Sequence, residues 1–247
     1  MNAWRLVASP SGAGDWNMAV DAALIDSVVD SGTCCLRFYS WSEPTVSLGY
    51  FQAHADRETH AASRVCPLVR RPTGGGAIVH DREVTYSFIT PAAGPLASAA
   101  QQLYRLLHET LIGALSEWGI KAVLADRPFG PPAAAEPFLC FRRRAEGDVT
   151  LGAHKVAGSA QRRRRGAVLQ HGSVLLTGSP QAPELPGITD LGGVQIDARE
   201  LQFTWRARLA NVCRISWQPQ PLTADEVKQA TRLVEETYSR SAWTLRR

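Results

Sequence analysis

The sequence lacks the features that would place it among membrane or secreted proteins. It has 247 residues, 45% of them hydrophobic and 20% charged, but no run of about 18 apolar residues that could form a transmembrane helix. The N-terminus shows no basic segment followed by an apolar one, so we expect no signal peptide. Internal repeats and low-complexity segments are also missing. These absences predict a cytoplasmic globular protein with no membrane partner.

Cysteine pairs of the kind that bind zinc are missing too. The five cysteines are odd in number and irregularly spaced, and none forms a C-x-x-C pair. A disulfide framework and a zinc site are therefore not expected, and we predict no metal in the site. A reducing cytoplasm is the better match to this cysteine usage.

Two common phosphate-binding motifs are absent, although the chain has a glycine-rich segment, "RRPTGGGAIVHD", from Arg70 to Asp81. No GK[ST] follows the glycines, and G-x-G-x-x-G does not occur. Three residues without Cβ would let a ligand or another backbone lie against the main chain, with N–H groups aimed at an anion. In a strand, Arg70 and Arg71 point to opposite faces, so one of them can reach the same pocket. The segment is either a ligand-binding loop or a glycine-rich turn with surface arginines.

The net positive charge is small, but the arginines are concentrated in two short runs. The net charge is +4, with arginine runs at 142–144 and 162–165. A basic rim would steer an acidic partner. No aromatic interleaving or known motif supports nucleic acid, so we expect no nucleic-acid partner. A solvated loop is the alternative for the second run.

Hydrophobic periodicity predicts helices over 15–29 and 103–119. Thr223 stands three residues before Glu226, a capping-box pattern that opens a final helix over 223–239. Short β-branched and aromatic segments predict strands over 34–41, 44–51, 65–73, 77–90 (with a turn near 81–82), 149–161 and 167–176. The last two are expected to be joined by the second arginine run, and 127–137 is expected to be a Pro-rich loop. Strands outnumber helices without regular alternation, which predicts an α+β fold with a mixed β-sheet flanked by helices.

Two long blocks make the sequence resemble a known family. "RRPTGGGAIVHD" followed by "HKVAGSAQRRRRGAVLQHGSVLL" is similar to the protein-lipoylation family, which holds lipoate–protein ligases and octanoyltransferases and is related to biotin–protein ligases. "DWNMAVDAAL", "WSEPTVSLGYFQ" and the ending "YSRSAWTLRR" also resemble it, so the resemblance covers nearly the whole chain. It implies a class II aminoacyl-tRNA-synthetase/biotin-ligase-like catalytic domain over 1–247, with a short C-terminal helical segment at about 222–247.

The resemblance also implies a site in which an eight-carbon acyl chain lies against the bare glycine backbone. Small residues would shape a narrow acyl slot, and a histidine in the second block would have a supporting role. The residues implied to bind the acyl substrate are Arg70, Arg71, Thr73, Gly74, Gly75, Gly76, His80, Gly158, Ser159, Ala160, His171 and Gly172.

Cys140 and Lys155 are the implied catalytic residues. Lys155 resembles the active-site lysine of the family, and its ammonium suits the negative charge that develops in acyl transfer. Cys140, 15 residues earlier, resembles the acyl-accepting cysteine of one octanoyltransferase group, a role that suits a thiolate nucleophile. The plainer alternatives are a solvated strand lysine and a buried, inert cysteine.

The implied function is an acyltransferase that moves an octanoyl or lipoyl group from a carrier-protein thioester to a lysine of a lipoyl domain through a Cys140 acyl-enzyme. Such an enzyme requires no cofactor. The alternatives are a lipoate–protein ligase, which would need ATP and Mg²⁺, and an acyl-binding scaffold without turnover. The implied partners are an acidic acyl carrier protein or the glycine-cleavage H protein, as donor or acceptor, and the lipoyl domains of 2-oxo acid dehydrogenases.

Overall fold

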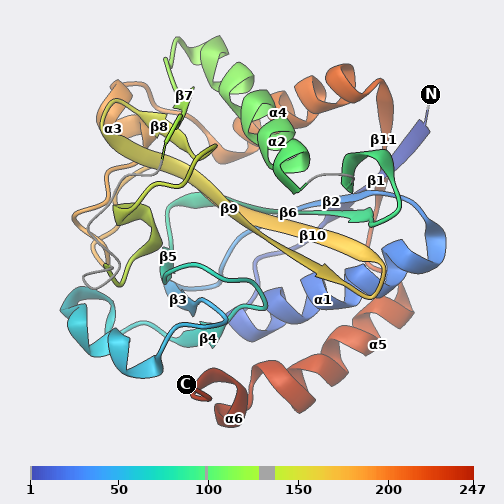
Figure 1. Ribbon diagram of the computed structural model, residues 1–247, viewed down its shortest axis with the longest axis horizontal. Coiled ribbons are helices and arrows are strands. Elements are labelled where there is room, and N and C mark those ends of the chain that lie inside the picture. Colours follow the sequence, from blue (N-terminus) through green and yellow to red (C-terminus); the bar gives the residue numbers. More distant parts are fainter. Residues whose placement is uncertain (1, 98–99, 128–136) are drawn as a thin grey trace.

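The computed structural model describes residues 2–97, 100–127 and 137–247, and it has the mixed α+β architecture that the sequence predicts (Figure 1). Eight strands form one large sheet in the order β11-β1-β2-β6-β10-β9-β8-β7. Strand β1 pairs in parallel with β11 and β2, whereas the other neighbours are antiparallel. The bounds are β1 Asn2–Ala8, β2 Cys35–Tyr39, β6 Glu83–Pro91, β7 Val123–Leu124, β8 Val149–Leu151, β9 His154–Arg164, β10 Ala167–Leu175 and β11 Ile215–Gln220.

A second sheet of three strands lies beside the first, in the order β4-β3-β5. Its strands are β3 Thr45–Leu48, β4 Leu68–Arg70 and β5 Ile78–His80. The expected turn near Asp81 and Arg82 is confirmed, since β5 ends at His80 and β6 begins at Glu83. This turn carries the chain from the small sheet to the large one, so it does not join a hairpin.

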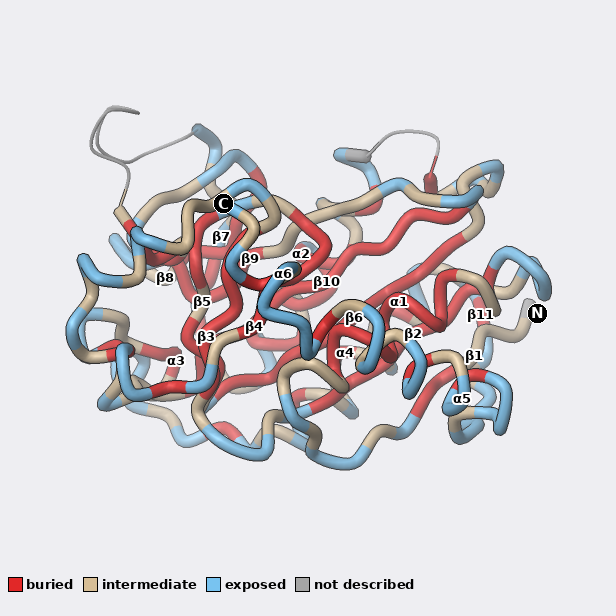
Figure 2. The backbone as a smooth tube through the Cα atoms, turned by 90° about the horizontal axis from the view of Figure 1, so that it is seen from below, coloured by how far each residue is buried: buried red, intermediate tan, exposed pale blue. Residues whose placement is uncertain are grey.

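Helices cover both faces of the large sheet (Figure 1). α1 (Gly14–Ser31) and α5 (Ala224–Leu233) lie on one face, and α2 (Ala100–Leu115) and α4 (Ala198–Cys213) lie on the other. Figure 2 shows the buried residues running along the strands between these helices. The remaining short helices are α3 Ile188–Gly192 and α6 Ser241–Thr244, and the 3-10 turns are His54–Thr59, Ala61–Ser63, Pro95–Ala97, Ser116–Trp118 and Cys140–Arg142.

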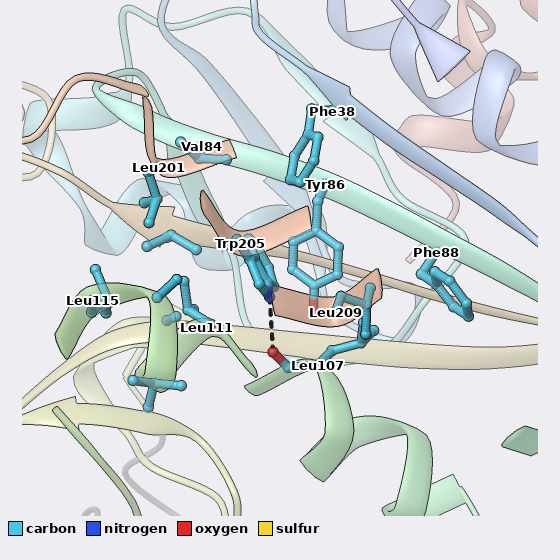
Figure 3. Packing of buried hydrophobic residues seen from close by; sticks show 14 of the residues in the cluster. Phe38, Val84, Tyr86, Phe88, Leu107, Leu111, Leu115, Leu201, Trp205 and Leu209 are labelled. Carbon is cyan, nitrogen blue, oxygen red and sulfur yellow. Dashed lines mark hydrogen bonds between the residues drawn. The ribbon is translucent and has the colours of Figure 1, made fainter. Parts of the chain in front are cut away.

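Helix α4 is not predicted by the sequence, because only three of its residues are buried hydrophobic side chains, Leu201, Trp205 and Leu209. They stand four residues apart and form one narrow stripe. The Trp205 indole donates to the carbonyl of Leu107 at 3.2 Å and packs edge-on against Tyr86 with ring centroids 4.8 Å apart (Figure 3). A single large aromatic side chain thus anchors α4 to α2 and to the sheet.

The ends of two predicted helices are confirmed. α2 continues into the turn Ser116–Trp118, and Gly119 closes it in the left-handed region with φ 72°. Thr223 and Glu226 cap each other's backbone N–H as expected. The last predicted helix is confirmed as one continuous helical segment, but its final part is π-helical. α5 ends at Leu233, a π-helical turn spans Val234–Tyr238, and α6 follows.

Two predictions around the second sequence block are wrong. Residues 149–161 are not one strand, because Gly152 turns the chain with φ 57° and folds β8 back on β9. The arginine run is not the connection, because Arg162, Arg163 and Arg164 lie within β9 and only Arg165 stands in the turn to β10. The predicted Pro-rich loop over 127–137 lies outside the described residues except at its two ends.

Within the described ranges, no helix combines the length and the apolar character that a membrane crossing requires.

Candidate functional site

A cavity of about 410 Å³ takes its walls from both sheets, a volume typical of small-molecule sites. The small sheet contributes β3, β5 and the glycine loop, residues 74–76 between β4 and β5. The large sheet contributes β6, β9 and β10. Most of the predicted site residues line it: Arg71, Gly74, Gly75, His80, Cys140, Lys155, Gly158, Ser159, Ala160, His171 and Gly172. The structure thus brings together the two sequence blocks, which are far apart in the chain.

Two of the three glycines, Gly75 and Gly76, let segments of backbone approach one another closely. Gly75 has φ 95°, a conformation that favours glycine, and a Cβ on Gly49 would overlap its carbonyl oxygen. A Cβ on Gly76 would lie 3.2 Å from the backbone nitrogen of Cys140. Cys140 itself donates its N–H to the carbonyl of Ala77 at 2.8 Å. The glycine loop therefore seats the segment that carries Cys140.

The two neighbouring arginines have different surroundings. The Arg71 guanidinium lines the cavity and donates to the carbonyls of Gly74 and Gly76, at 2.7 Å each. Burial lowers the pKa of Arg71 to about 10. Arg70 instead faces the C-terminal segment, where it donates to the carbonyls of Thr244 at 2.8 Å and Gln52 at 2.7 Å. Arg70 is fully buried there and is not among the residues that line the cavity.

Cys140 and Lys155 meet inside the cavity. The Lys155 ammonium lies 3.8 Å from the Cys140 sulfur and is buried, with 7% of the residue exposed. Burial opposes ionisation of the thiol, but the charges of Lys155 and Arg71 outweigh it, so the pKa of Cys140 lies below 9.0. Burial also opposes the charge on Lys155, yet Cys140 and Asp148 raise its pKa. The sequence alternative of a solvated lysine is therefore wrong.

The other cysteines have the opposite electrostatic environment. Burial raises the pKa of Cys34 and Cys66, that of Cys35 to about 12 and that of Cys213 to about 11. A thiol with a raised pKa is a poor nucleophile at neutral pH because little of it is ionised. Cys140 thus differs from the other four cysteines because the positive charges of Lys155 and Arg71 lie near its thiol.

Asp148 is a site residue that the sequence interpretation missed. Its carboxylate is fully buried, lies 2.9 Å from the Lys155 ammonium and accepts the Tyr104 hydroxyl at 2.6 Å. The wrong strand assignment hid it, because only the turn at Gly152 brings Asp148 beside Lys155. The available signal is the position of Asp148, which directly precedes the apolar strand β8. A charged residue that is buried there is expected to have a partner, since buried charges are usually paired.

The small residues of β9 and β10 let neighbouring side chains lie close to the backbone. A Cβ on Gly158 would lie 2.6 Å from the Lys155 ammonium, and one on Gly172 would lie 2.6 Å from the Ser159 hydroxyl oxygen. Gly158 thus makes room for the lysine side chain. The Ser159 hydroxyl lies 2.6 Å from both His108 Nε2 and the Tyr86 hydroxyl. Burial lowers the pKa of His108 to about 4, so its ring is neutral near pH 7.

Two buried histidines in the wall each join a hydroxyl to a carboxylate. His80 lies 2.8 Å from the Ser47 hydroxyl and 2.6 Å from Glu83.

His171 lies 2.6 Å from the Thr73 hydroxyl and 3.2 Å from Asp21, and burial lowers its pKa. Thr73 therefore contacts a cavity residue without lining the cavity itself. Across the described ranges, no three His, Cys, Asp or Glu side chains are grouped to hold a metal.

Comparison with known proteins identifies relatives in sequence and in structure. A bacterial "Octanoyltransferase LipM" of Kyrpidia tusciae is 32% identical, with 100% of both chains covered. The protein of the same name in Clostridioides difficile is also 32% identical, again over 100% of both chains. The bi-partite lipoate protein ligase of Thermoplasma acidophilum, solved in a study with its E2 lipoyl domain, superposes with a TM-score of 0.76. That match covers 99% of this chain and 96% of the other at 21% identity, so it shows a shared fold.

Residues 14–233 match the family described as "Lipoyl protein ligase A/B catalytic domain", a range that holds the glycine loop, Cys140 and Lys155. The full-length relatives support the same grouping. The chain therefore belongs to the family of the lipoyl protein ligase A/B catalytic domain.

Proposed function

We propose that this protein is an octanoyltransferase that carries the acyl group on Cys140 between a carrier thioester and a lysine of a lipoyl domain. Its full-length relatives are named octanoyltransferases. The observation that carries the proposal is the contact between Lys155 and Cys140 at 3.8 Å inside the cavity, which lowers the pKa of this thiol alone among the five cysteines.

In the first half-reaction, the Cys140 thiolate attacks the carbonyl carbon of the carrier thioester. A new carbon–sulfur bond forms, the old one breaks, and the carrier leaves as a thiolate. Lys155 and Arg71 place positive charge where the carbonyl oxygen becomes negative. One thioester replaces another of nearly equal energy, so this step consumes no ATP.

In the second half-reaction, the neutral amine of the acceptor lysine attacks the acyl-Cys140 carbonyl. A carbon–nitrogen bond forms, the carbon–sulfur bond breaks, and Cys140 leaves as a thiolate beside Lys155. The proton of the amine passes to solvent. The thiolate leaves readily because its charge is already stabilised in the site. The mechanism needs a free thiol, which fits a reducing compartment such as the cytoplasm.

The proposed partners are acidic. An acyl carrier protein or the glycine-cleavage H protein would supply or accept the octanoyl group, and lipoyl domains of 2-oxo acid dehydrogenases would accept it. The Thermoplasma neighbour was studied with its E2 lipoyl domain. Arginine side chains near the site would steer such partners to it.

Mass spectrometry of the intact protein tests the proposed function. Incubation with octanoyl carrier alone should add one octanoyl group, and hydroxylamine should remove it because it cleaves thioesters. Cys140→Ala should abolish the adduct and the transfer together, since both half-reactions share one covalent intermediate. The matched control is Cys66→Ala, because Cys66 is a buried thiol outside the cavity.

Other outcomes identify the alternatives. Transfer that requires ATP and persists in Cys140→Ala would make the protein a lipoate–protein ligase. A folded protein that binds octanoate but transfers nothing under either condition would be an acyl-binding scaffold.

A further inference from the structure

The buried carboxylate of Asp148 has a role that the proposed function leaves open. We propose that Asp148, itself held by Tyr104, is a positioning residue that fixes the Lys155 ammonium beside the Cys140 sulfur. This inference rests on the proposed function, because it concerns the same two reacting groups.

Each oxygen of Asp148 has its own donors. Oδ1 accepts the Tyr104 hydroxyl at 2.6 Å. Oδ2 accepts the N–H of Ala145 at 2.6 Å and lies 2.9 Å from the Lys155 ammonium. Burial raises the pKa of Tyr104 far above its ordinary range, so its hydroxyl keeps its proton and remains a donor. The carboxylate is therefore anchored from two sides before it meets the lysine.

Lys155 needs such an anchor because its side chain is long and flexible. A lysine side chain loses rotamer entropy when it is held in one conformation. The ammonium passes over Gly158, where no Cβ confines it, and lies 5.2 Å from the Phe141 ring. Asp148 is the acidic side chain that holds the ammonium at hydrogen-bond distance.

The charge on Asp148 affects Cys140 in two opposite directions. Acting directly, a negative charge near a thiol raises the thiol pKa, and Asp148 does so here. Acting through Lys155, the same carboxylate stabilises the ammonium that lowers the thiol pKa. The other charges that face Cys140 are Arg71 and Arg143, which lower its pKa. The sign of the change on removing Asp148 therefore separates a positioning role from a mere neighbouring charge.

The test is the pH dependence of Cys140 alkylation in Asp148→Asn, a variant that keeps the shape and removes the charge. Iodoacetamide labelling of the Cys140 peptide, followed by mass spectrometry, reports the ionised thiol without any acyl donor. Positioning predicts that the alkylation midpoint rises by about one pH unit, a tenfold smaller thiolate fraction near pH 7. A lower midpoint would overturn the proposal, because it would show that Asp148 acts only as a nearby negative charge. An unchanged midpoint would also overturn it.

Two further variants keep the test decisive. Tyr104→Phe removes one anchor and leaves both charges, so it should raise the midpoint by less and in the same direction. In Lys155→Ala the midpoint should be high, and adding Asp148→Asn should not raise it further, since the ammonium to be placed is gone. A further rise in the double variant would contradict the proposal. Circular dichroism and the unfolding midpoint show whether each variant is folded.

This readout is separate from the proposed function. If the wild-type protein takes no octanoyl group from a carrier, the proposed function fails, while the direction of the alkylation shift still decides the role of Asp148. If loading occurs but Asp148→Asn lowers the midpoint, only the positioning role fails.

Discussion

Arg70 and Arg71 show how neighbouring residues of one motif can have unrelated contacts. Arg70 is the last residue of β4 and Arg71 directly follows it, and their side chains lie in different surroundings. Arg71 enters the cavity and organises the glycine loop, whereas Arg70 binds backbone carbonyls of the C-terminal segment. The sequence predicts that one of them can reach the pocket but does not say which, because the answer depends on which face of β4 meets the cavity.

At the same scale, Gly158→Ala should weaken catalysis without unfolding the protein. The added Cβ would lie 2.6 Å from the Lys155 ammonium, which is the mobile end of a side chain and can move away. A displaced ammonium should slow octanoyl loading by about 10²–10³-fold, as loss of one oxyanion donor does elsewhere. Single-turnover loading followed by mass spectrometry measures this rate.

The matched control is Gly178→Ala, whose new Cβ would lie 3.5 Å from its nearest neighbours, outside the cavity. Loading at the wild-type rate in Gly158→Ala would mean that the lysine position has little influence on the reaction.

At the scale of elements, α6 is held against the small sheet by contacts in both directions. The Arg70 guanidinium donates to the carbonyl of Thr244, and the Trp243 indole donates to the carbonyl of Arg70 at 2.9 Å. The backbone N–H of His54 reaches the carbonyl of Arg247 at 2.7 Å. These bonds place the last helix next to the segment that follows β3.

Arg70→Ala should therefore lower stability rather than substrate affinity. Several buried carbonyls would lose a charged donor, which should reduce the free energy of unfolding by roughly 2–4 kcal/mol. Urea unfolding followed by tryptophan fluorescence measures it. Arg64→Ala, at an exposed arginine, is the control and should change stability by less than about 0.5 kcal/mol. A stable Arg70→Ala protein with a raised KM for a small octanoyl thioester would instead support the acyl-binding role implied by the family resemblance.

At the scale of the whole molecule, the second arginine run, 162–165, differs from a simple basic rim. Arg163 donates to the carbonyl of Ala97 at 2.7 Å, and Arg165 pairs with Asp26 at 2.9 Å. A second basic surface, the aromatic–arginine rim, shares Arg162 with this run. It is formed by Tyr50, Phe51, Arg162, Arg246 and Arg247. Phe51 lines a groove together with Gly75, which also lines the cavity, so this rim adjoins the candidate site.

Reversing Arg246 and Arg247 to Glu should raise the KM for an acidic octanoyl carrier about tenfold at low salt. The difference should shrink above about 0.15 M salt, where exposed charges are screened beyond ~8 Å. Turnover of an uncharged small octanoyl thioester should stay the same. Arg199→Glu with Arg214→Glu, at exposed positions on α4 and at its end, makes an equal change of charge and serves as control. Equal KM values in the two double variants would place the docking surface elsewhere.

Much of this molecule is determined locally by its sequence. The helical periodicity of 15–29, the capping box of Thr223 and Glu226 and the prediction of an α+β fold are all confirmed. The family resemblance implies Cys140 and Lys155 as catalytic residues, and the structure brings their side chains within 3.8 Å. The helix, the cap and the fold class follow from short-range rules of spacing, capping and backbone freedom, whereas the two site residues follow from the family resemblance. The role of Cys140 as nucleophile and the single-domain organisation over 1–247 stay predictions.

Tertiary structure alone decided how the site residues differ from one another. The turn at Gly152 places Asp148 beside Lys155, and the choice of sheet face separates Arg71 from Arg70. Five cysteines that look alike in sequence acquire pKa values shifted in opposite directions. The physical reason is that burial and charge–charge interaction depend on distances between residues remote in the chain, which strand pairing sets and local sequence patterns do not encode.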